Sequence, residues 1–167
     1  QMGFKENIVV KFFSAEEEKN SPCTDTNTKY SENGNIHATS VCNHPSISDI
    51  LGFVLLKTDN KVSFTRDSNR IRHGDKVLAV FMEHIRGKDL LDVIETNDCD
   101  FHSMPKEEHK RLIKNFLLML RYTHMNQVFH HDIKPENIIF DRDLKLVDWD
   151  LSTKTDYVGM RGTLIYI

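Results

Sequence analysis

The sequence has few cysteines and no long apolar segment, and each shortage excludes a class of protein. Its three cysteines are odd in number and widely spaced, and it contains no Asn-x-Ser/Thr glycosylation site. We therefore expect no disulfide framework, and the pattern is typical of a reducing, intracellular compartment, either cytoplasmic or nuclear. The longest apolar run, residues 77–82, is far shorter than the roughly 20 residues needed to cross a bilayer. The first residues are polar and charged, so we expect no signal peptide.

A strong excess of charge of one sign is also lacking. The 167 residues carry a net charge of −3 at pH 7, which provides no basic field for nucleic acid or for an anionic membrane surface. We expect neither as a partner. The nine histidines lack the paired spacing of structural zinc ligands, so no zinc site is expected. With 39% hydrophobic and 28% charged residues, the composition is that of an ordinary globular protein with one core.

Hydrophobic periodicity predicts strands early in the chain and helices later. Strands are expected over residues 8–13, 50–57 and 77–82. The last of these is almost continuously apolar, which predicts burial on both faces. Residues 58–76 are polar and predict a long connection. A short helix is expected over residues 89–94, and Ser103 is expected to cap a long amphipathic helix that ends near Asn126.

The most informative stretch is residues 129–152. It contains two acids, Asp132 and Asp148, with Lys134 and Asn137 between them. Two short apolar runs flank a charged turn, which predicts a loop, a hairpin and then an acid at the end of a strand. Carboxylate and amide oxygens suit a hard divalent cation. The stretch therefore predicts a site that holds a cation and a polyphosphate beside a carboxylate able to accept a proton.

In order and spacing, these residues resemble the catalytic core of eukaryotic-type protein kinases. The family signatures H-R-D-x-x-x-x-N, D-F-G and V-A-I-K have counterparts in His130-His131-Asp132 with Asn137, in Asp148-Trp149-Asp150 and in Val9-Val10-Lys11. Further matches in family order are His44-Pro45, a hinge after Met82 and a G-T-x-x-Y pattern at residues 162–166. The resemblance implies a partial two-lobe fold of the α+β class. Residues 1–82 would form a small β-rich N-lobe, and residues 83–167 the hinge and the first part of a helical C-lobe, with the catalytic loop and activation segment.

The resemblance implies a role for each polar residue of the site. Asp132 would be the catalytic base for a substrate hydroxyl, and Lys134 would neutralise the transferring γ-phosphoryl group of ATP. Asn137 and Asp148 would ligate Mg²⁺, while Lys11 would contact the α- and β-phosphates. Taken alone, Lys11 reads as a solvent-facing edge-strand lysine, and Asp148 as an ordinary acid at the end of a strand.

The resemblance also implies contacts to the adenosine part of ATP. The backbone of Glu83 and Ile85 would hydrogen-bond adenine, and Val9 and Ile139 would lie on either side of its ring. Asp89 stands where the family often places an acid that binds the ribose. The alternative for Asp89 is a simple N-cap of the helix that follows it.

Several positions depart from the family pattern. The glycine-rich loop that covers the phosphates is not among the residues before Lys11, and the A-P-E motif is not among those at the other end. The glutamate expected to pair with Lys11 falls on Asn35, with Glu32 one turn earlier as a substitute. His131 replaces the arginine of H-R-D. Asp150 replaces the glycine of D-F-G and adds a Cβ and a negative charge where the backbone normally flexes.

Three functional hypotheses follow. The first is a protein Ser/Thr kinase that uses ATP and Mg²⁺ and is represented by a fragment of its catalytic domain; Lys134 and Thr163 favour Ser/Thr over Tyr substrates. The second is a catalytically impaired pseudokinase or a truncated decoy that binds another kinase. The third is a small soluble domain with an accidental match. For the isolated chain we expect weak or absent phosphoryl transfer, and a partly uncovered apolar face on the helix around Leu112–Leu120.

Overall fold

The structure is a computed structural model that describes residues 7–13 and 34–154. Glu32 and Thr163, together with the pattern at residues 162–166, lie outside the described residues. The elements in chain order are β1 (Ile8–Phe12), α1 (Gly34–Ala38), β2 (Ile50–Leu56), β3 (Val62–Thr65), η2 (Ser68–Arg70), β4 (Lys76–Glu83), β5 (Lys88–Asp89), α2 (Leu90–Glu95), α3 (Cys99–His102), α4 (Lys106–Met125), η3 (Pro135–Asn137), β6 (Ile138–Asp141) and β7 (Asp143–Leu146).

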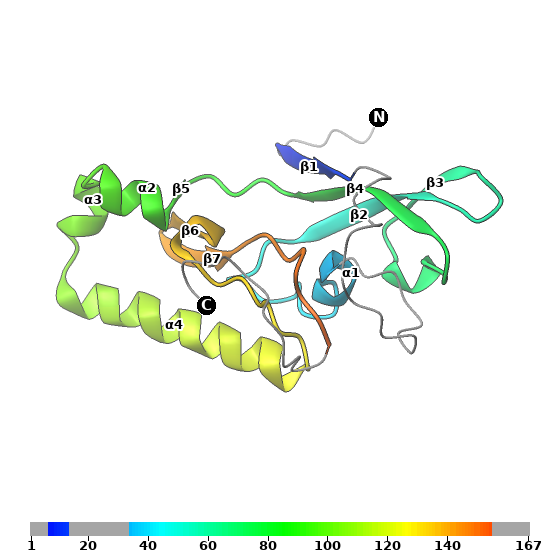
Figure 1. The fold of residues 1–167 in the computed structure, drawn as a ribbon. Coiled ribbons are helices and arrows are strands. Elements are labelled where there is room, and N and C mark those ends of the chain that lie inside the picture. The colour runs from blue at the N-terminus through cyan, green and yellow to red at the C-terminus, as the bar shows by residue number, and fades with distance from the viewer. Residues whose placement is uncertain (1–6, 14–33, 155–167) are drawn as a thin grey trace, which may run out of the picture.

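A four-stranded antiparallel sheet in the order β1-β4-β2-β3 lies at one end of the molecule (Figure 1). The predicted strands are confirmed as β1, β2 and β4. Ala79 and Val80 are adjacent in β4 and both are buried, as expected for a strand covered on both faces. Lys11 pairs with Val80 in the register of β1 and β4, so its position along the sheet is fixed by pairing with the buried strand β4.

The polar connection predicted over residues 58–76 is wrong in part, because β3 and η2 lie within it. β3 pairs with β2 at the edge of the sheet, where Val62 is 65% and Phe64 is 55% exposed. A strand of four residues with two exposed apolar side chains buries little surface, so its sequence carries only a weak strand pattern.

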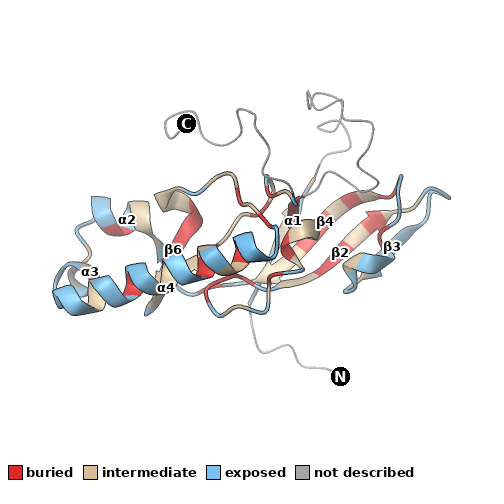
Figure 2. Ribbon diagram, turned by 90° about the horizontal axis from the view of Figure 1, so that it is seen from below, coloured by how far each residue is buried: buried red, intermediate tan, exposed pale blue. Residues whose placement is uncertain are grey.

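The main core lies between α1, α4 and the β6–β7 hairpin. Its completely buried side chains include Val41, Met119, Leu146 and Trp149. Figure 2 shows buried residues on β2, β4 and one side of α4. The predicted hairpin is confirmed: β6 and β7 pair in antiparallel register and join β5 in a second, three-stranded sheet. The division between residues 82 and 83 stays a prediction, and it falls one residue before the end of β4.

The long helix α4 begins later than predicted. Ser103 does not cap it; the residue at the N-cap is Pro105, whose carbonyl accepts hydrogen bonds from Glu108 N and His109 N. The reason is the proline ring, which disfavours helical geometry in the preceding residue, so the helix starts after it. The end of the helix at Asn126 agrees with the prediction.

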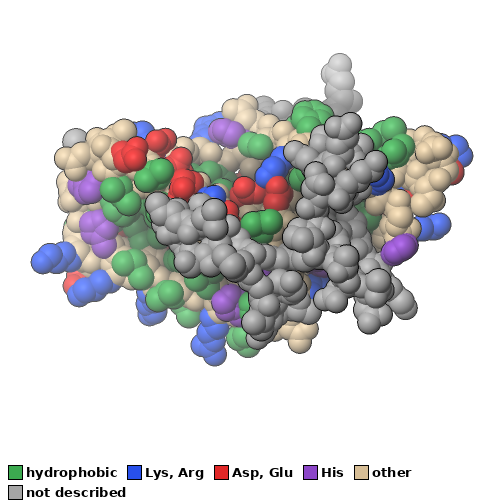
Figure 3. Space-filling model, viewed as in Figure 1, with side chains coloured by type: hydrophobic (Ala, Val, Ile, Leu, Met, Phe, Trp, Pro, Cys, Tyr) green, Lys and Arg blue, Asp and Glu red, His purple; other side chains and the backbone are tan. Residues whose placement is uncertain are grey.

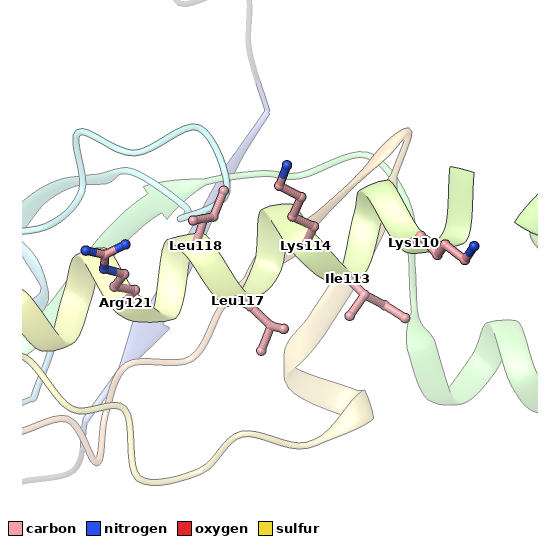
Figure 4. Close-up of a pocket in the computed structure, with 6 residues that line it drawn as sticks. All are labelled: Lys110, Ile113, Lys114, Leu117, Leu118 and Arg121. Atoms are coloured by element: carbon pink, nitrogen blue, oxygen red, sulfur yellow. The ribbon is translucent and has the colours of Figure 1, made fainter. Parts of the chain in front are cut away.

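One side of α4 is apolar and exposed, as expected from the sequence. Ile113 and Leu117 are more than half exposed and extend from the same side of the helix (Figure 4). They line a surface pocket together with Leu118 and the basic residues Lys110, Lys114 and Arg121. The opposite side packs into the core. Among the described residues, no helix is long and apolar enough to span a membrane.

Candidate active site

The predicted catalytic, phosphate-binding and metal-binding residues lie close together, on β1, on the loop before the β6–β7 hairpin and on the segment after it. Figure 3 shows acidic and basic side chains side by side near the middle of this face. The loop of residues 130–137 supplies one part of the site, and residues 148–152 after β7 supply another. Val147 N donates a 2.9 Å hydrogen bond to Asn137 O, which joins the two parts directly. The backbone therefore places Asn137 beside the residue that precedes Asp148.

Asp132 is held by two donors on one carboxylate oxygen. Asn137 Nδ2 lies 3.0 Å from Asp132 Oδ2 and also donates to the Asp132 backbone oxygen at 2.8 Å. Lys134 Nζ lies 3.0 Å from the same Oδ2. The hydrogen bond to Asp132 raises the pKa of Lys134, against the smaller effect of burial, so the ammonium stays charged beside the carboxylate. The structure thus brings the three residues together in one hydrogen-bonded group.

His130 fixes the orientation of this loop, a role that the sequence did not reveal. Its Nε2 donates to Val147 O at 2.9 Å, and its Nδ1 accepts from Asp132 N at 3.2 Å. The imidazole lies against the Trp149 ring, with centroids 4.7 Å apart. Burial lowers the pKa of His130, which favours the neutral ring that can donate through one nitrogen and accept through the other. Its place as the first residue of the H-x-D motif was the only available signal.

The lowered pKa of His130 predicts a pH-dependent stability. The unfolded chain binds a proton near pH 6.5, whereas the folded chain does so only at lower pH, so stability is lost as pH falls below about 6.5. One such proton contributes at most about 1.4 kcal/mol per pH unit. His130→Gln should therefore flatten the dependence of the urea unfolding free energy on pH between pH 5 and 7. His73→Gln, which replaces an exposed histidine outside the site, is the matched control, and an equal flattening by both variants would contradict the assignment.

Asp148 and Lys11 form an ion pair across the site. Lys11 Nζ lies 2.9 Å from Asp148 Oδ1 and also pairs with Asp150 Oδ2. Burial, the largest single influence, acts to lower the pKa of Lys11, but hydrogen bonds to Asp150 and Asp148 outweigh it and the pKa is raised. Asp148 adopts left-handed backbone geometry with φ of 58°, which is uncommon for a residue with a side chain and marks a constrained position. Lys11 does lie on an edge strand, because β1 ends the sheet, but its ammonium pairs with the two acids and does not simply extend into solvent.

The donor set fits a shared magnesium ion. Asn137 directs its amide nitrogen to Asp132, which leaves the amide oxygen as its donor atom for a cation. Asp148 uses one carboxylate oxygen for Lys11 and has a second. No group of three or more His, Cys, Asp or Glu side chains within residues 7–13 and 34–154 could hold a metal by itself. Mg²⁺ commonly takes one or two protein oxygens together with phosphate oxygens and water, so these two residues match its requirements.

One backbone N–H of the predicted hinge is already paired within the protein. Glu83 N already donates to Asp49 O at 2.8 Å, so this N–H is not available to a base. The Glu83 side chain accepts from Lys145 Nζ at 3.1 Å, which ties the hinge to β7. Of the two hinge residues, Ile85 would therefore have to provide the backbone N–H that donates to adenine, and Ile85 is buried. The contact of the two hinge backbones with adenine stays a prediction.

The residues expected to contact the ribose and the adenine ring lie on β5, β6 and β1. Asp89 caps α2, with its Oδ1 accepting from Asp92 N at 2.8 Å, so the N-cap alternative describes its structural role. Ile139 pairs with Asp89 across β5 and β6. Val9 lies on β1, paired with Met82, and is partly exposed. The ribose contact and the position of the base between Val9 and Ile139 stay predictions.

Comparison with known proteins agrees with this arrangement. Residues 3–167 match the family described as the protein kinase domain. The chain is 36% identical over 106 residues to the serine/threonine-protein kinase cds1 of Schizosaccharomyces pombe, covering 59% of this chain and 22% of that protein. It is 27% identical over 126 residues to a probable serine/threonine-protein kinase KIN1 homolog of Enterocytozoon bieneusi, covering 74% and 18%.

A solved structure agrees with the fold. The kinase PK-1 of Cydia pomonella granulovirus superposes with a TM-score of 0.58 at 23% identity, covering 83% of this chain and 48% of that one. The chain thus spans about a fifth of the two curated relatives and about half of the solved kinase. The family match extends over nearly all of the sequence and includes the loop of Asp132 and the acid Asp148. The chain therefore belongs to the protein kinase family, and its fold is a partial kinase fold.

Proposed function

We propose that this chain is part of a protein serine/threonine kinase that binds ATP with Mg²⁺ and transfers the γ-phosphate to a Ser or Thr hydroxyl of a protein substrate. The observation that carries the proposal is the hydrogen-bonded group of Asp132, Lys134 and Asn137, joined through the backbone to Asp148 and its partner Lys11. The matched relatives named as serine/threonine kinases support the same substrate class.

Each side chain has a chemical task in this proposal. The Asp132 carboxylate, aligned by two donors, would accept the proton of the substrate hydroxyl as the new bond to phosphorus forms. Lys134, charged and beside it, would compensate negative charge on the transferring group, and Lys11 would meet the inner phosphates as a point charge. Mg²⁺, when bound through Asn137 and Asp148, supplies the charge that neutralises the phosphate oxygens.

The alternative of a pseudokinase or decoy rested in part on the losses at Asn35 and Asp150. That part of its support is weakened because Lys11 is held by acids in spite of the asparagine. Weak transfer by the isolated chain would still agree with the proposal, since a kinase needs parts that the matched relatives carry outside this stretch.

Thermal denaturation with and without Mg-ATP tests the proposal. At a ligand concentration of about 100 times Kd the folded state gains about 2.7 kcal/mol. For a chain of this size that corresponds to an increase in Tm of roughly 5–10 °C. Asp148→Asn should remove most of the increase, because it weakens both the cation site and the pair with Lys11. Glu95→Gln, an exposed acid on α2, should retain it.

Chelation with EDTA should reduce the increase in the wild-type chain, since the phosphates then lack their metal. Transfer of a radiolabelled γ-phosphate to a mixture of Ser- and Thr-containing peptides would measure the reaction itself. A wild-type chain that gains no stability from Mg-ATP at millimolar concentration would contradict the proposal.

A further inference from the structure

Two departures from the family sequence meet at one point in space. Asn35 on α1 stands where a glutamate would pair with Lys11, and Asp150 stands where a glycine would follow the aromatic residue. The two positions are 115 residues apart in the chain, yet Asn35 Nδ2 donates to Asp150 Oδ1 at 2.5 Å. The other oxygen of the same carboxylate, Oδ2, pairs with Lys11 Nζ. Each oxygen of Asp150 therefore contacts one of the two other residues.

We propose that Asp150 is the positioning residue for Lys11, and that Asn35 aligns its carboxylate from α1. In this arrangement the negative charge that orients the lysine has moved from the helix to the segment after β7. The proposal rests on the proposed function, since its purpose is to hold Lys11 ready for the phosphates of ATP. In this proposal, Asn35 and Asp150 together take the place of the glutamate and the glycine of the family pattern.

The backbone around Asp150 is built to keep its side chain in place. Gly34 N donates to Asp150 O at 3.1 Å, and Ser152 Oγ donates to Gly34 O at 2.5 Å. A Cβ on Gly34 would overlap the backbone oxygens of Trp149 and Asp150, so only glycine permits this close approach. The start of α1 is thus joined to residues 149–152 independently of the side-chain contacts.

The charges explain why the two substitutions require each other. Asn35 is completely buried, and an amide there can donate to a carboxylate without bringing a second charge. A glutamate at position 35 would bring a third carboxylate beside an ammonium that already pairs with Asp148 and Asp150, a repulsive arrangement in a poorly solvated place. A glycine at position 150 alone would leave Lys11 with Asp148, which is also an expected metal ligand. Asp150 gives Lys11 a second partner that is not an expected metal ligand.

Chemical labelling of lysines in the absence of nucleotide tests the proposal. The chain is treated with a limiting amine-acylating reagent at about pH 9, and acylation of each lysine is measured by mass spectrometry. Asp150→Asn should increase acylation of Lys11 several-fold, because loss of the charged partner releases the amine from one of its two ion pairs. Lys57, which pairs with Asp75, is the internal reference and should not change. Glu95→Gln is the matched control and should label as the wild type does.

A charge-exchange variant provides the decisive comparison. Asn35→Glu alone and Asp150→Gly alone should each disturb Lys11, whereas the double variant Asn35→Glu with Asp150→Gly should return its labelling toward the wild-type level. A merely structural role of Asp150 predicts that the double variant is at least as disturbed as the worse single one. Should Asp150→Asn fail to fold by circular dichroism, the double variant still decides the question.

A second readout separates this proposal from the proposed function. The Mg-ATP concentration that half-protects Lys11 should rise several-fold in Asp150→Asn and recover in the double variant. If labelling follows the expected pattern but Mg-ATP protects Lys11 in none of the chains, Asp150 holds Lys11 and the proposed function is wrong. If Lys11 labels equally in wild type and Asp150→Asn, or the double variant shows no recovery, the positioning role is overturned.

Discussion

Asparagine in place of Asp132 is expected to slow phosphoryl transfer by about 10²- to 10⁴-fold, the usual contribution of a positioned general base. Asparagine has nearly the same shape and can keep a hydrogen bond within the loop, but it cannot take the proton of the attacking hydroxyl. Since Asp132 pairs with Lys134 and Asn137, part of the loss would also come from a weaker alignment of these two side chains.

The measurement is the initial rate of radiolabel transfer, with the wild-type chain as reference. Nucleotide binding should be largely preserved, so Asp132→Asn should keep most of the increase in Tm that Mg-ATP gives. This distinguishes it from Asp148→Asn, which should lose both. Glu95→Gln should transfer at the wild-type rate. A wild-type rate clearly above background, together with a rate in Asp132→Asn within a factor of two of it, would refute the assignment of the base.

Replacement of Trp149 by alanine is expected to lower the free energy of unfolding by about 3–5 kcal/mol, the range for removal of a large aromatic from a core. Trp149 is completely buried in the main core, contacts the His130 ring and donates through Nε1 to Leu146 O. Its removal would leave a cavity in the core at the residue between Asp148 and Asp150, at the point where the site joins the core.

Urea denaturation followed by circular dichroism measures this effect. Tryptophan fluorescence cannot be used, because Trp149 is the single tryptophan and the alanine variant would have no tryptophan emission. Trp149→Phe keeps most of the apolar volume and should cost clearly less than the alanine variant. Leu117→Ala, on the exposed side of α4, should change stability by well under 1 kcal/mol. Equal losses in the Trp149 and Leu117 alanine variants would contradict the core assignment.

Much of the fold could be predicted because its signals are local. The buried strand β4 and the helix α4 each have a continuous or periodic apolar pattern, and both were found. The loop from Asp132 to Asn137 and the acid Asp148 were identified from motif order, and the structure brings them together. The start of α4 differs from the prediction because Pro105 disfavours helical geometry in the residue before it.

Other features depend on contacts between distant segments and left no local signal. β3 is recognisable only beside β2, since half of its side chains face solvent. In the sequence, Asn35 and Asp150 each looked like the loss of a useful residue. The contact between Asn35 and Asp150, on which their proposed compensation rests, is seen only in the structure, because the two residues are 115 positions apart in the sequence. The capping role of Asp89 was recognised as an alternative because a helix start is a local pattern.

Asp150 also links two segments that are distant from each other in the sequence. Its side chain contacts Asn35 and Lys11, and its carbonyl accepts from Gly34 N. Because all of these contacts belong to one residue, a fluctuation that displaces Asp150 would break its contacts with α1 and with Lys11 together. We therefore expect the start of α1 and residues 149–152 to open as one unit, with the amides of Gly34 and Ser152 exchanging in the same event.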